Sequence, residues 1–146
     1  MRHHLILRVV TKLLVGTIIL FALYVQFHGD FSPGGGFQAG VIMAVAFILY
    51  GVVFSLDHVQ RVFPPWLVHK LVALGVLIYA GTGLFSFLRG FRYLDYAAFD
   101  PGHPSHGEHY GILLVELGVG VTVTGVMVAV YYAFASRTPV ISDEDW

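Results

Sequence analysis

The chain has 146 residues, of which 57% are hydrophobic and 12% are charged, and its formal net charge is −1. A soluble domain carries about 25% charged residues, so this composition excludes an ordinary soluble domain and indicates an integral membrane protein, while the absence of a basic tail gives no support to nucleic-acid binding. The chain contains no cysteine, which excludes disulfides, thiolate catalysis and cysteine-ligated metal centres.

The apolar residues gather in four runs that are long enough to cross a bilayer, which takes roughly 20 residues per helix. These runs predict transmembrane helices at approximately 9–27, 37–56, 67–88 and 111–135. We therefore expect an all-α integral membrane protein that forms a single membrane domain over residues 1–146. The first run is long and no small-x-small cleavage site precedes His28, so it is expected to be a helix rather than a cleaved signal peptide. Arg8 and Lys12 would reach the membrane interface from it.

The connections between the runs carry most of the polar residues. Asp57 opens a polar connection that ends at Pro64-Pro65, where the next helix is expected to begin. Asp57 and Lys70 lie close to predicted helix ends, which favours an interfacial position over a place on an ion path. The longest connection, residues 89–110, is rich in aromatic residues and is expected to lie along the membrane surface or against a partner.

The distribution of positive charge predicts the orientation. Four helices place both termini on one side, together with six basic residues: Arg2, Arg8, Lys12, Arg61, Lys70 and Arg137. The other side carries Arg89 and Arg92. Both termini are therefore expected to be cytoplasmic.

A glycine-rich stretch joins the first two helices. Its residues of interest are Pro33, Gly34, Gly35, Gly36, Phe37, Gln38 and Gly40. Pro33 suits the second position of a tight turn, and Gly34 is expected to take the positive φ that a type II turn requires next. Gly36, Gly40 and Ala44 follow at a spacing of four, which predicts close helix packing in lipid. The stretch is interpreted as a compact structural turn, with docking to another subunit as the alternative.

Glu116 is the candidate ion-pathway residue, because it is the charged residue inside the predicted last helix. A carboxylate within the bilayer costs roughly 2.5–3.5 kcal/mol and normally faces protein, water or a counter-ion. With the helix beginning at Gly111, Glu116 is expected roughly 8 Å from its outer end. Proton or cation contact and a purely structural hydrogen bond both remain open.

Three histidines recur every three residues in the long connection, at His103, His106 and His109, with Glu108 beside the last. Imidazole and carboxylate can bind zinc. Pro104 and Gly107 are expected to interrupt any helix that would align the histidines, so a histidine-rich surface loop without a metal is preferred. No serine nucleophile elbow, P-loop or paired-histidine motif is present, and we expect no cofactor and no enzymatic activity.

The segment from Pro33 to Gly40, preceded by His28-Gly29, resembles the signature of the B subunit of the multisubunit (Mrp-type) Na+/H+ antiporters. The segment from Gly111 to Val123 is similar to the last-helix pattern of the same subunit. The resemblance covers most of the chain. It implies a small membrane subunit that supports exchange of Na+ or K+ for protons as part of a complex.

The same resemblance implies the partners and the location. The partners would be the large subunits that resemble the proton pumps of respiratory complex I and the other small membrane subunits, within the lipid bilayer of the bacterial cytoplasmic (inner) membrane. An alternative is a membrane-arm subunit of a hydrogenase-type complex, in which related subunits occur. A membrane-embedded metallohydrolase that uses the outer histidines is disfavoured.

Overall fold

The chain is described here by a computed structural model, which places residues 5–29 and 33–137. The elements in order are α1 (Leu5–Phe27), α2 (Gly36–Phe54), α3 (Leu56–Val62), α4 (Pro65–Leu88), the 3-10 helix η1 (Tyr96–Ala98) and α5 (Pro104–Ala135). The described ranges contain helices and no strand. Four of the helices, α1, α2, α4 and α5, are long and apolar enough to cross a membrane. The predicted all-α class with four spanning helices is therefore confirmed.

Several helix boundaries differ from the sequence-based ones, and three of the differences bear on the packing or the site. The first helix begins at Leu5, before the predicted position 9. The second ends at Phe54, and α3 follows it as a separate short helix because Ser55 has a φ of 115° that no helix can accommodate. The last helix begins at Pro104, well before the predicted position 111. Pro104 occupies the first turn of α5, where a proline needs no hydrogen-bond partner and its fixed φ suits the helix.

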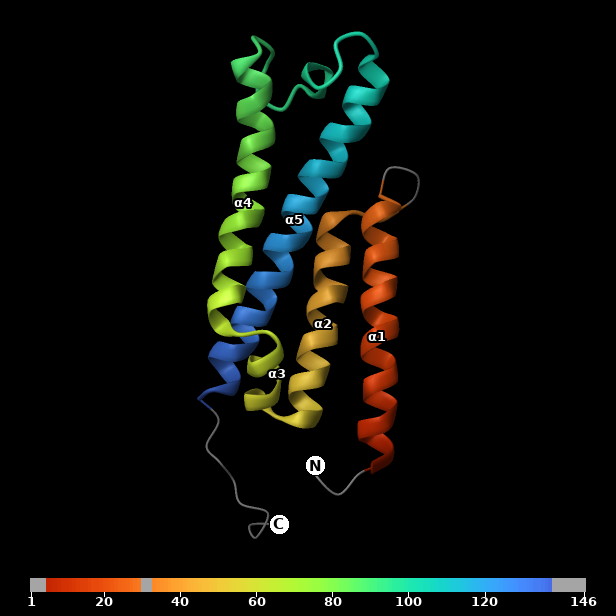
Figure 1. Cartoon of the computed structure of the whole chain (residues 1–146), viewed down its shortest axis with the longest axis vertical. Helices are drawn as coiled ribbons and strands as arrows, with labels where there is room; N and C mark the ends of the chain where they lie inside the picture. The colour runs from red at the N-terminus through yellow and green to blue at the C-terminus, as the bar shows by residue number, and fades with distance from the viewer. Residues whose placement is uncertain (1–4, 30–32, 138–146) are drawn as a thin grey trace.

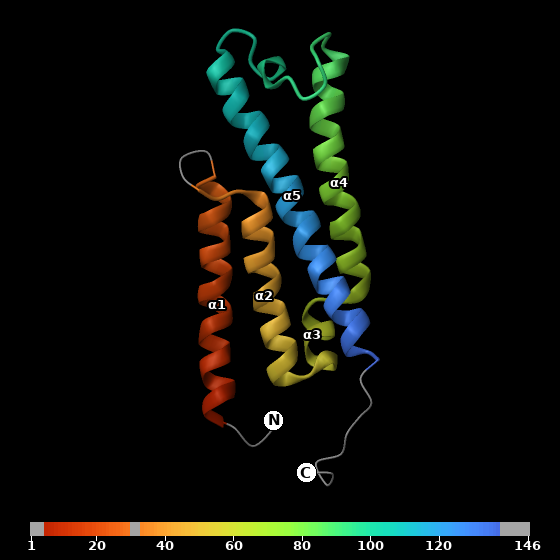
Figure 2. The ribbon, with the colours of Figure 1, turned by 180° about the vertical axis from the view of Figure 1, so that it is seen from behind.

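The helices form a bundle that is taller on one side (Figures 1 and 2). In both views α4 and α5 rise above α1 and α2, and α5 runs obliquely across the bundle. α1 packs mainly against α2, α2 against α5, and α5 against α4. The start of α1 and the end of α5 lie at the same end as α3 (Figure 1), which we call the lower end. The opposite end, which carries η1, is the upper end.

The core lies near the lower end, where α2, α3, α4 and α5 meet. Its buried members are Ala44, Val59, Phe63, Val68, Val128 and Tyr132. The Tyr132 hydroxyl donates a hydrogen bond of 2.7 Å to the Phe63 carbonyl, which ties α5 to the end of α3. Phe63 also stacks on Phe47 with ring centroids 4.4 Å apart. The sequence predicted neither α3 nor its part in this core.

Three cations of the lower half lie over aromatic rings. The Arg8 guanidinium and the Lys12 ammonium lie 5.0 and 5.7 Å from the Phe54 ring centroid at the end of α2. The Lys70 ammonium lies 4.8 Å from the Trp66 ring. Cation–π contacts of this kind hold long basic side chains beside an aromatic surface.

The connection between α4 and α5 packs against its own helices. Phe99 stacks on Phe85 of α4, with ring centroids 4.8 Å apart, and the Arg89 Nη1 group donates a 3.0 Å hydrogen bond to the Ala98 carbonyl. Tyr96 covers Gly111 of α5. Burial raises the pKa of the Tyr96 phenol above its usual value, and Tyr79 raises it further. Aromatic contacts within the chain thus account for much of the aromatic content of this connection.

Candidate functional site

The loop that joins α1 to α2, residues 28–35, is called the glycine loop, and residues 28, 29 and 33–35 of it are described. Gly35 immediately precedes α2 with φ 127° and ψ −179°, a conformation that is essentially restricted to glycine. Its carbonyl accepts a 3.0 Å hydrogen bond from the Ala39 amide. The prediction that Gly34 takes the positive φ is wrong, because among the described loop residues Gly35 takes it.

Glu116 of α5 lies against the glycine loop. A Cβ built on Gly29 would overlap the Glu116 carboxylate, with Oε1 2.6 Å away. A Cβ built on Gly35 would lie 2.9 Å from the same oxygen. The carboxylate therefore occupies space that side chains at Gly29 and Gly35 would fill. The structure thus brings together the two features that the sequence singled out separately.

The start of α2 meets the backbone of Glu116 as well. A Cβ on Gly36 would overlap the Glu116 carbonyl oxygen and lie 2.7 Å from its carbonyl carbon. The first amide groups of a helix have no partner within the helix, and the aligned peptide dipoles make this end positive. The Glu116 carboxylate thus lies beside a helix terminus that favours negative charge.

The depth of Glu116 differs from the prediction. Because α5 begins at Pro104 and not at Gly111, Glu116 lies about 18 Å from the upper end of its helix instead of roughly 8 Å. Its contacts with Gly29, Gly35 and Gly36 place it at the level where α1 ends and α2 begins. The part of α5 above Glu116 extends past the shorter pair of helices (Figure 1).

The small-residue stripe of α2 packs closely against another helix, and the structure identifies that helix as α5. A Cβ on Gly40 would lie 2.7 Å from the Gly120 carbonyl oxygen and 2.8 Å from the Val123 Cβ. Thr124 bridges the two helices, since its hydroxyl lies 3.2 Å from the Gly40 carbonyl and 2.8 Å from the Gly120 carbonyl. Ala44 continues the stripe and is fully buried. Close approach of α2 and α5 is what holds Glu116 against the glycine loop.

The remaining predicted residues lie at the edge of this site. Pro33, Phe37 and Gln38 are exposed at the start of α2. Asp57 lies in the first turn of α3 at the lower end of the bundle, where its charge suits a helix start. Lys70 lies in the lower part of α4, so the structure does not bring Asp57 or Lys70 to Glu116.

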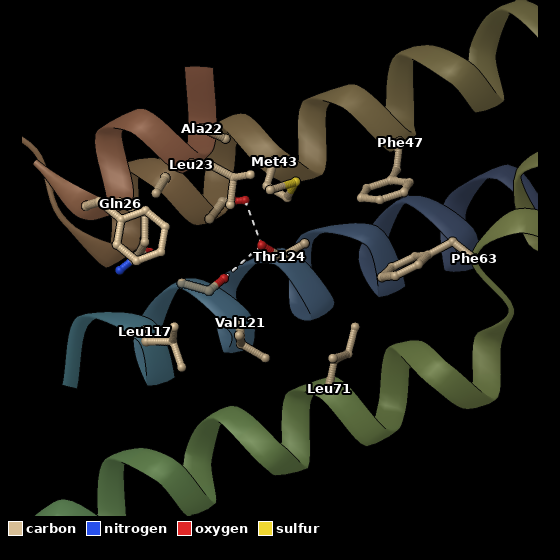
Figure 3. A pocket seen from close by; sticks show the side chains of 14 residues that line it. Ala22, Leu23, Gln26, Met43, Phe47, Phe63, Leu71, Leu117, Val121 and Thr124 are labelled. Atoms are coloured by element: carbon tan, nitrogen blue, oxygen red, sulfur yellow. Dashed lines mark hydrogen bonds between the residues drawn. The ribbon is translucent and has the colours of Figure 1, made fainter. Parts of the chain in front are cut away.

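A pocket of about 280 Å³ opens between the α1–α2 pair and the α4–α5 pair (Figure 3). Apolar side chains line most of it, among them Leu23, Phe47 and Leu71. Gln26 of α1 also lines it and is 8% exposed, and its Nε2 group has no hydrogen-bond partner among the described residues. Gln26 was not among the residues predicted from the sequence, although an amide side chain within the apolar first run could have pointed to it.

The prediction that the histidine-rich segment forms a loop is wrong for the second half of that segment. Pro104 and Gly107 do not interrupt α5, so His106 and His109 lie in its first turns. His103 and His106 come together with Asp100, a residue that the sequence analysis missed. His109 is not part of this group. The sequence could have pointed to Asp100 in one way. Asp100 lies three residues before His103, in a turn that leads to Pro104 at the start of α5.

The fold and the site define a multi-pass membrane protein whose four apolar helices meet through glycines and hold a carboxylate beside a glycine-rich loop. The chain belongs to the family described as "Domain related to MnhB subunit of Na+/H+ antiporter", which matches residues 6–129. The resemblance inferred from the sequence is therefore confirmed.

Relatives in three staphylococci carry the name "Putative antiporter subunit mnhB2". The Staphylococcus haemolyticus (strain JCSC1435) protein is 35% identical over 135 residues, which cover 91% of this chain and 95% of the relative. The Staphylococcus epidermidis (strain RP62A) and Staphylococcus aureus (strain Newman) proteins are each 34% identical over 130 residues, covering 88% of this chain and 92% of the relative. The similarity thus extends over nearly the whole length of these proteins.

Proposed function

We propose that the chain is a small membrane subunit of a multisubunit monovalent cation/proton antiporter and supports exchange of Na+ or K+ for protons as part of the complex. The observation that carries this proposal is the family match over residues 6–129, and the names of the relatives favour an antiporter over a hydrogenase-type complex. Stand-alone transporters usually rely on structural repeats and broken helices. The four spanning helices of this chain are continuous and hold one carboxylate beside a loop. This is a simpler arrangement than that of a stand-alone transporter, which supports an accessory role for the chain.

The proposed location is the bacterial cytoplasmic membrane, with both termini in the cytoplasm. The described basic residues Arg8, Lys12, Arg61, Lys70 and Arg137 support this orientation because they belong to the lower half of the bundle. Arg89 and Arg92 belong to the connection at the upper end. The excess of positive charge at the lower end is the pattern of a cytoplasmic side. The glycine loop and Glu116 would then lie toward the outside.

Within this function, Glu116 is proposed to contribute a titratable carboxylate to the ion path. Its position at the level of the α1–α2 connection supports this role, because a carboxylate there can exchange protons or contact cations from the upper side of the membrane. The glycines around it leave the carboxylate room, and the start of α2 offers a favourable electrostatic environment. The large subunits and the other small subunits would supply the rest of the path.

The pocket beside Gln26 is the proposed docking site for one side chain of a transmembrane helix in a neighbouring subunit, because its volume of about 280 Å³ is that of a single side chain and not of a helix. A buried amide donor without an acceptor costs about 1–3 kcal/mol. A lipid acyl chain offers no acceptor, whereas a helix can present a side-chain or carbonyl oxygen. Gln26→Leu should therefore raise the melting temperature of the isolated chain and lower recovery of the complex. A loss of stability in the isolated chain, or unchanged assembly, would contradict this proposal.

The test of Glu116 compares two carboxylates on the same helix. Glu116→Gln keeps the shape and removes the titratable group, and Glu108→Gln does the same at an exposed site near the start of α5. Native gels would measure assembly of the complex, and vesicles would measure cation-driven proton movement across a range of pH. We expect both variants to assemble and only Glu116→Gln to lose exchange. Normal exchange by Glu116→Gln at every pH would make Glu116 a structural residue.

A further inference from the structure

A cluster of nitrogen and oxygen ligands lies at the upper end of the bundle, away from Glu116. The Nδ1 atoms of His103 and His106 lie 3.8 and 4.0 Å from the same oxygen, Oδ2 of Asp100. The two imidazole rings stack with centroids 5.5 Å apart. One ligand atom from each of the three residues lies within 4.8 Å of the other two. Two imidazoles and a carboxylate thus converge on one point.

The spacing of these atoms is close to what a shared metal ion requires. Zinc binds imidazole nitrogen and carboxylate oxygen at about 2.0–2.2 Å in a tetrahedral arrangement, in which neighbouring ligand atoms are about 3.4 Å apart. The separations of 3.8 and 4.0 Å exceed this by only a few tenths of an ångström. Both histidines are exposed, so small side-chain rotations can close the difference.

The backbone orients the carboxylate before any ion arrives. Oδ1 of Asp100 accepts hydrogen bonds of 3.2 Å from the amides of Gly102 and His103, which leaves Oδ2 facing the two rings. Gly107 fixes the distance between this turn and α5, since a Cβ there would lie 2.7 Å from the Tyr96 carbonyl oxygen and 3.0 Å from the Asp100 amide. Hydrogen bonds that orient a ligand in this way are typical of functional metal sites.

We propose that Asp100, His103 and His106 form a binding site for a divalent transition-metal ion of the zinc class. Three protein ligands leave a fourth position for water, as in other three-ligand zinc sites. Two imidazoles select against Mg²⁺ and Ca²⁺, which prefer oxygen ligands. A bound ion would join the turn after η1 to the first turn of α5 and fix the upper end of the taller helix pair. The site is independent of the proposed exchange function.

The test uses the full chain purified in detergent. Zn²⁺ binding would be measured by competition with a chromophoric chelator, and metal content by mass spectrometry after gel filtration. Co²⁺ would serve as a spectroscopic probe, because its visible absorption reports a tetrahedral site. We expect one high-affinity Zn²⁺ per chain, a higher melting temperature with Zn²⁺, and no effect of Mg²⁺. The double variant His103→Gln/His106→Gln should lose more than the roughly 10- to 100-fold in affinity that loss of an orienting partner costs.

Two further variants make the result decisive. Asp100→Asn keeps an oxygen that can accept the two amide hydrogen bonds but removes the charged ligand, so it should fold normally and bind Zn²⁺ weakly. His69→Gln changes a histidine whose Nδ1 lies 2.7 Å from the Pro65 carbonyl in the lower part of α4, and it should leave binding unchanged. If the double variant binds Zn²⁺ as tightly as the original chain, or if His69→Gln weakens binding equally, the assignment is overturned.

Discussion

Replacement of Gly36 by alanine should separate α2 from α5. The added Cβ would lie 2.7 Å from the carbonyl carbon of Glu116, whereas carbon atoms pack best at about 3.5–4.0 Å. The atoms that it meets belong to the backbone and cannot rotate away. The two helices must therefore move apart by roughly 0.8 Å at this point.

The cost follows from two losses. Overpacking of a tight contact costs about 1–3 kcal/mol. The hydrogen bond from Thr124 to the Gly40 carbonyl is already 3.2 Å long and would not survive the shift, and such bonds in membranes contribute about 0.6 kcal/mol. A total of about 2–4 kcal/mol corresponds to a roughly 30- to 700-fold shift in the packing equilibrium.

The matched control is Gly81→Ala, because a Cβ on Gly81 of α4 would meet no atom within 4 Å. Thermal unfolding of the purified chain and native-gel recovery of the complex should both fall for Gly36→Ala and stay near the original for Gly81→Ala. The amount of each chain in the membrane would be measured alongside. Equal melting temperatures for the two variants would refute the close packing of α2 on α5.

Three further predictions concern the glycine loop, the core and the orientation. Gly35→Val should damage assembly, since it forces a β-branched residue into a glycine-only conformation at a cost of about 1–3 kcal/mol. Gly29→Ala should still assemble on native gels but disturb exchange in vesicles, because its methyl group meets the movable Glu116 carboxylate. Tyr132→Phe should lower the melting temperature of the purified chain, because it leaves the Phe63 carbonyl without its donor at a cost of about 1–3 kcal/mol. A label at Ser105 should react from outside the cell while a C-terminal reporter stays cytoplasmic, and the reverse pattern would contradict the charge argument.

The effect of Gly29→Ala on assembly is expected to be mild although the site has no free space. From sequence alone, Gly29 lies outside the predicted helices and should have room for a methyl group. In the structure that space holds the Glu116 carboxylate. Assembly is spared only because a side chain can move where a backbone cannot, and the displaced carboxylate is the group whose function is proposed.

The apolar runs were enough to predict the four spanning helices, because hydrophobic length is a direct requirement of the bilayer. The start of α5 was missed because Pro104, Gly107 and three histidines look like a loop when their packing partners are unknown. Gly107 is helical because α5 packs there against the backbone of Tyr96 and Asp100. Proline at a helix start is common, and it was the signal that could have corrected the boundary.

The candidate site was only half predictable. The glycine stretch and Glu116 each stand out by residue type, but the sequence does not specify which helix faces meet, so their contact across some eighty residues was not foreseen. The spacing of Gly36, Gly40 and Ala44 correctly indicated a packing face and could not identify α5 as the partner. The proposed roles of Gln26 and Asp100 arise from their neighbours in the folded chain, which the sequence does not show.

The unequal heights of the two helix pairs have a consequence for the surrounding lipid. α2 has 19 residues and spans about 28 Å, whereas α4 has 24 residues and spans about 36 Å. Leu84, Phe87 and Leu88 keep the upper turns of α4 apolar and exposed. A bilayer whose thickness suits α2 leaves those side chains above the hydrocarbon, and one that suits α4 immerses the glycine loop. Helix tilt, contact with neighbouring subunits or a local change in membrane thickness must accommodate this hydrophobic mismatch within a single chain.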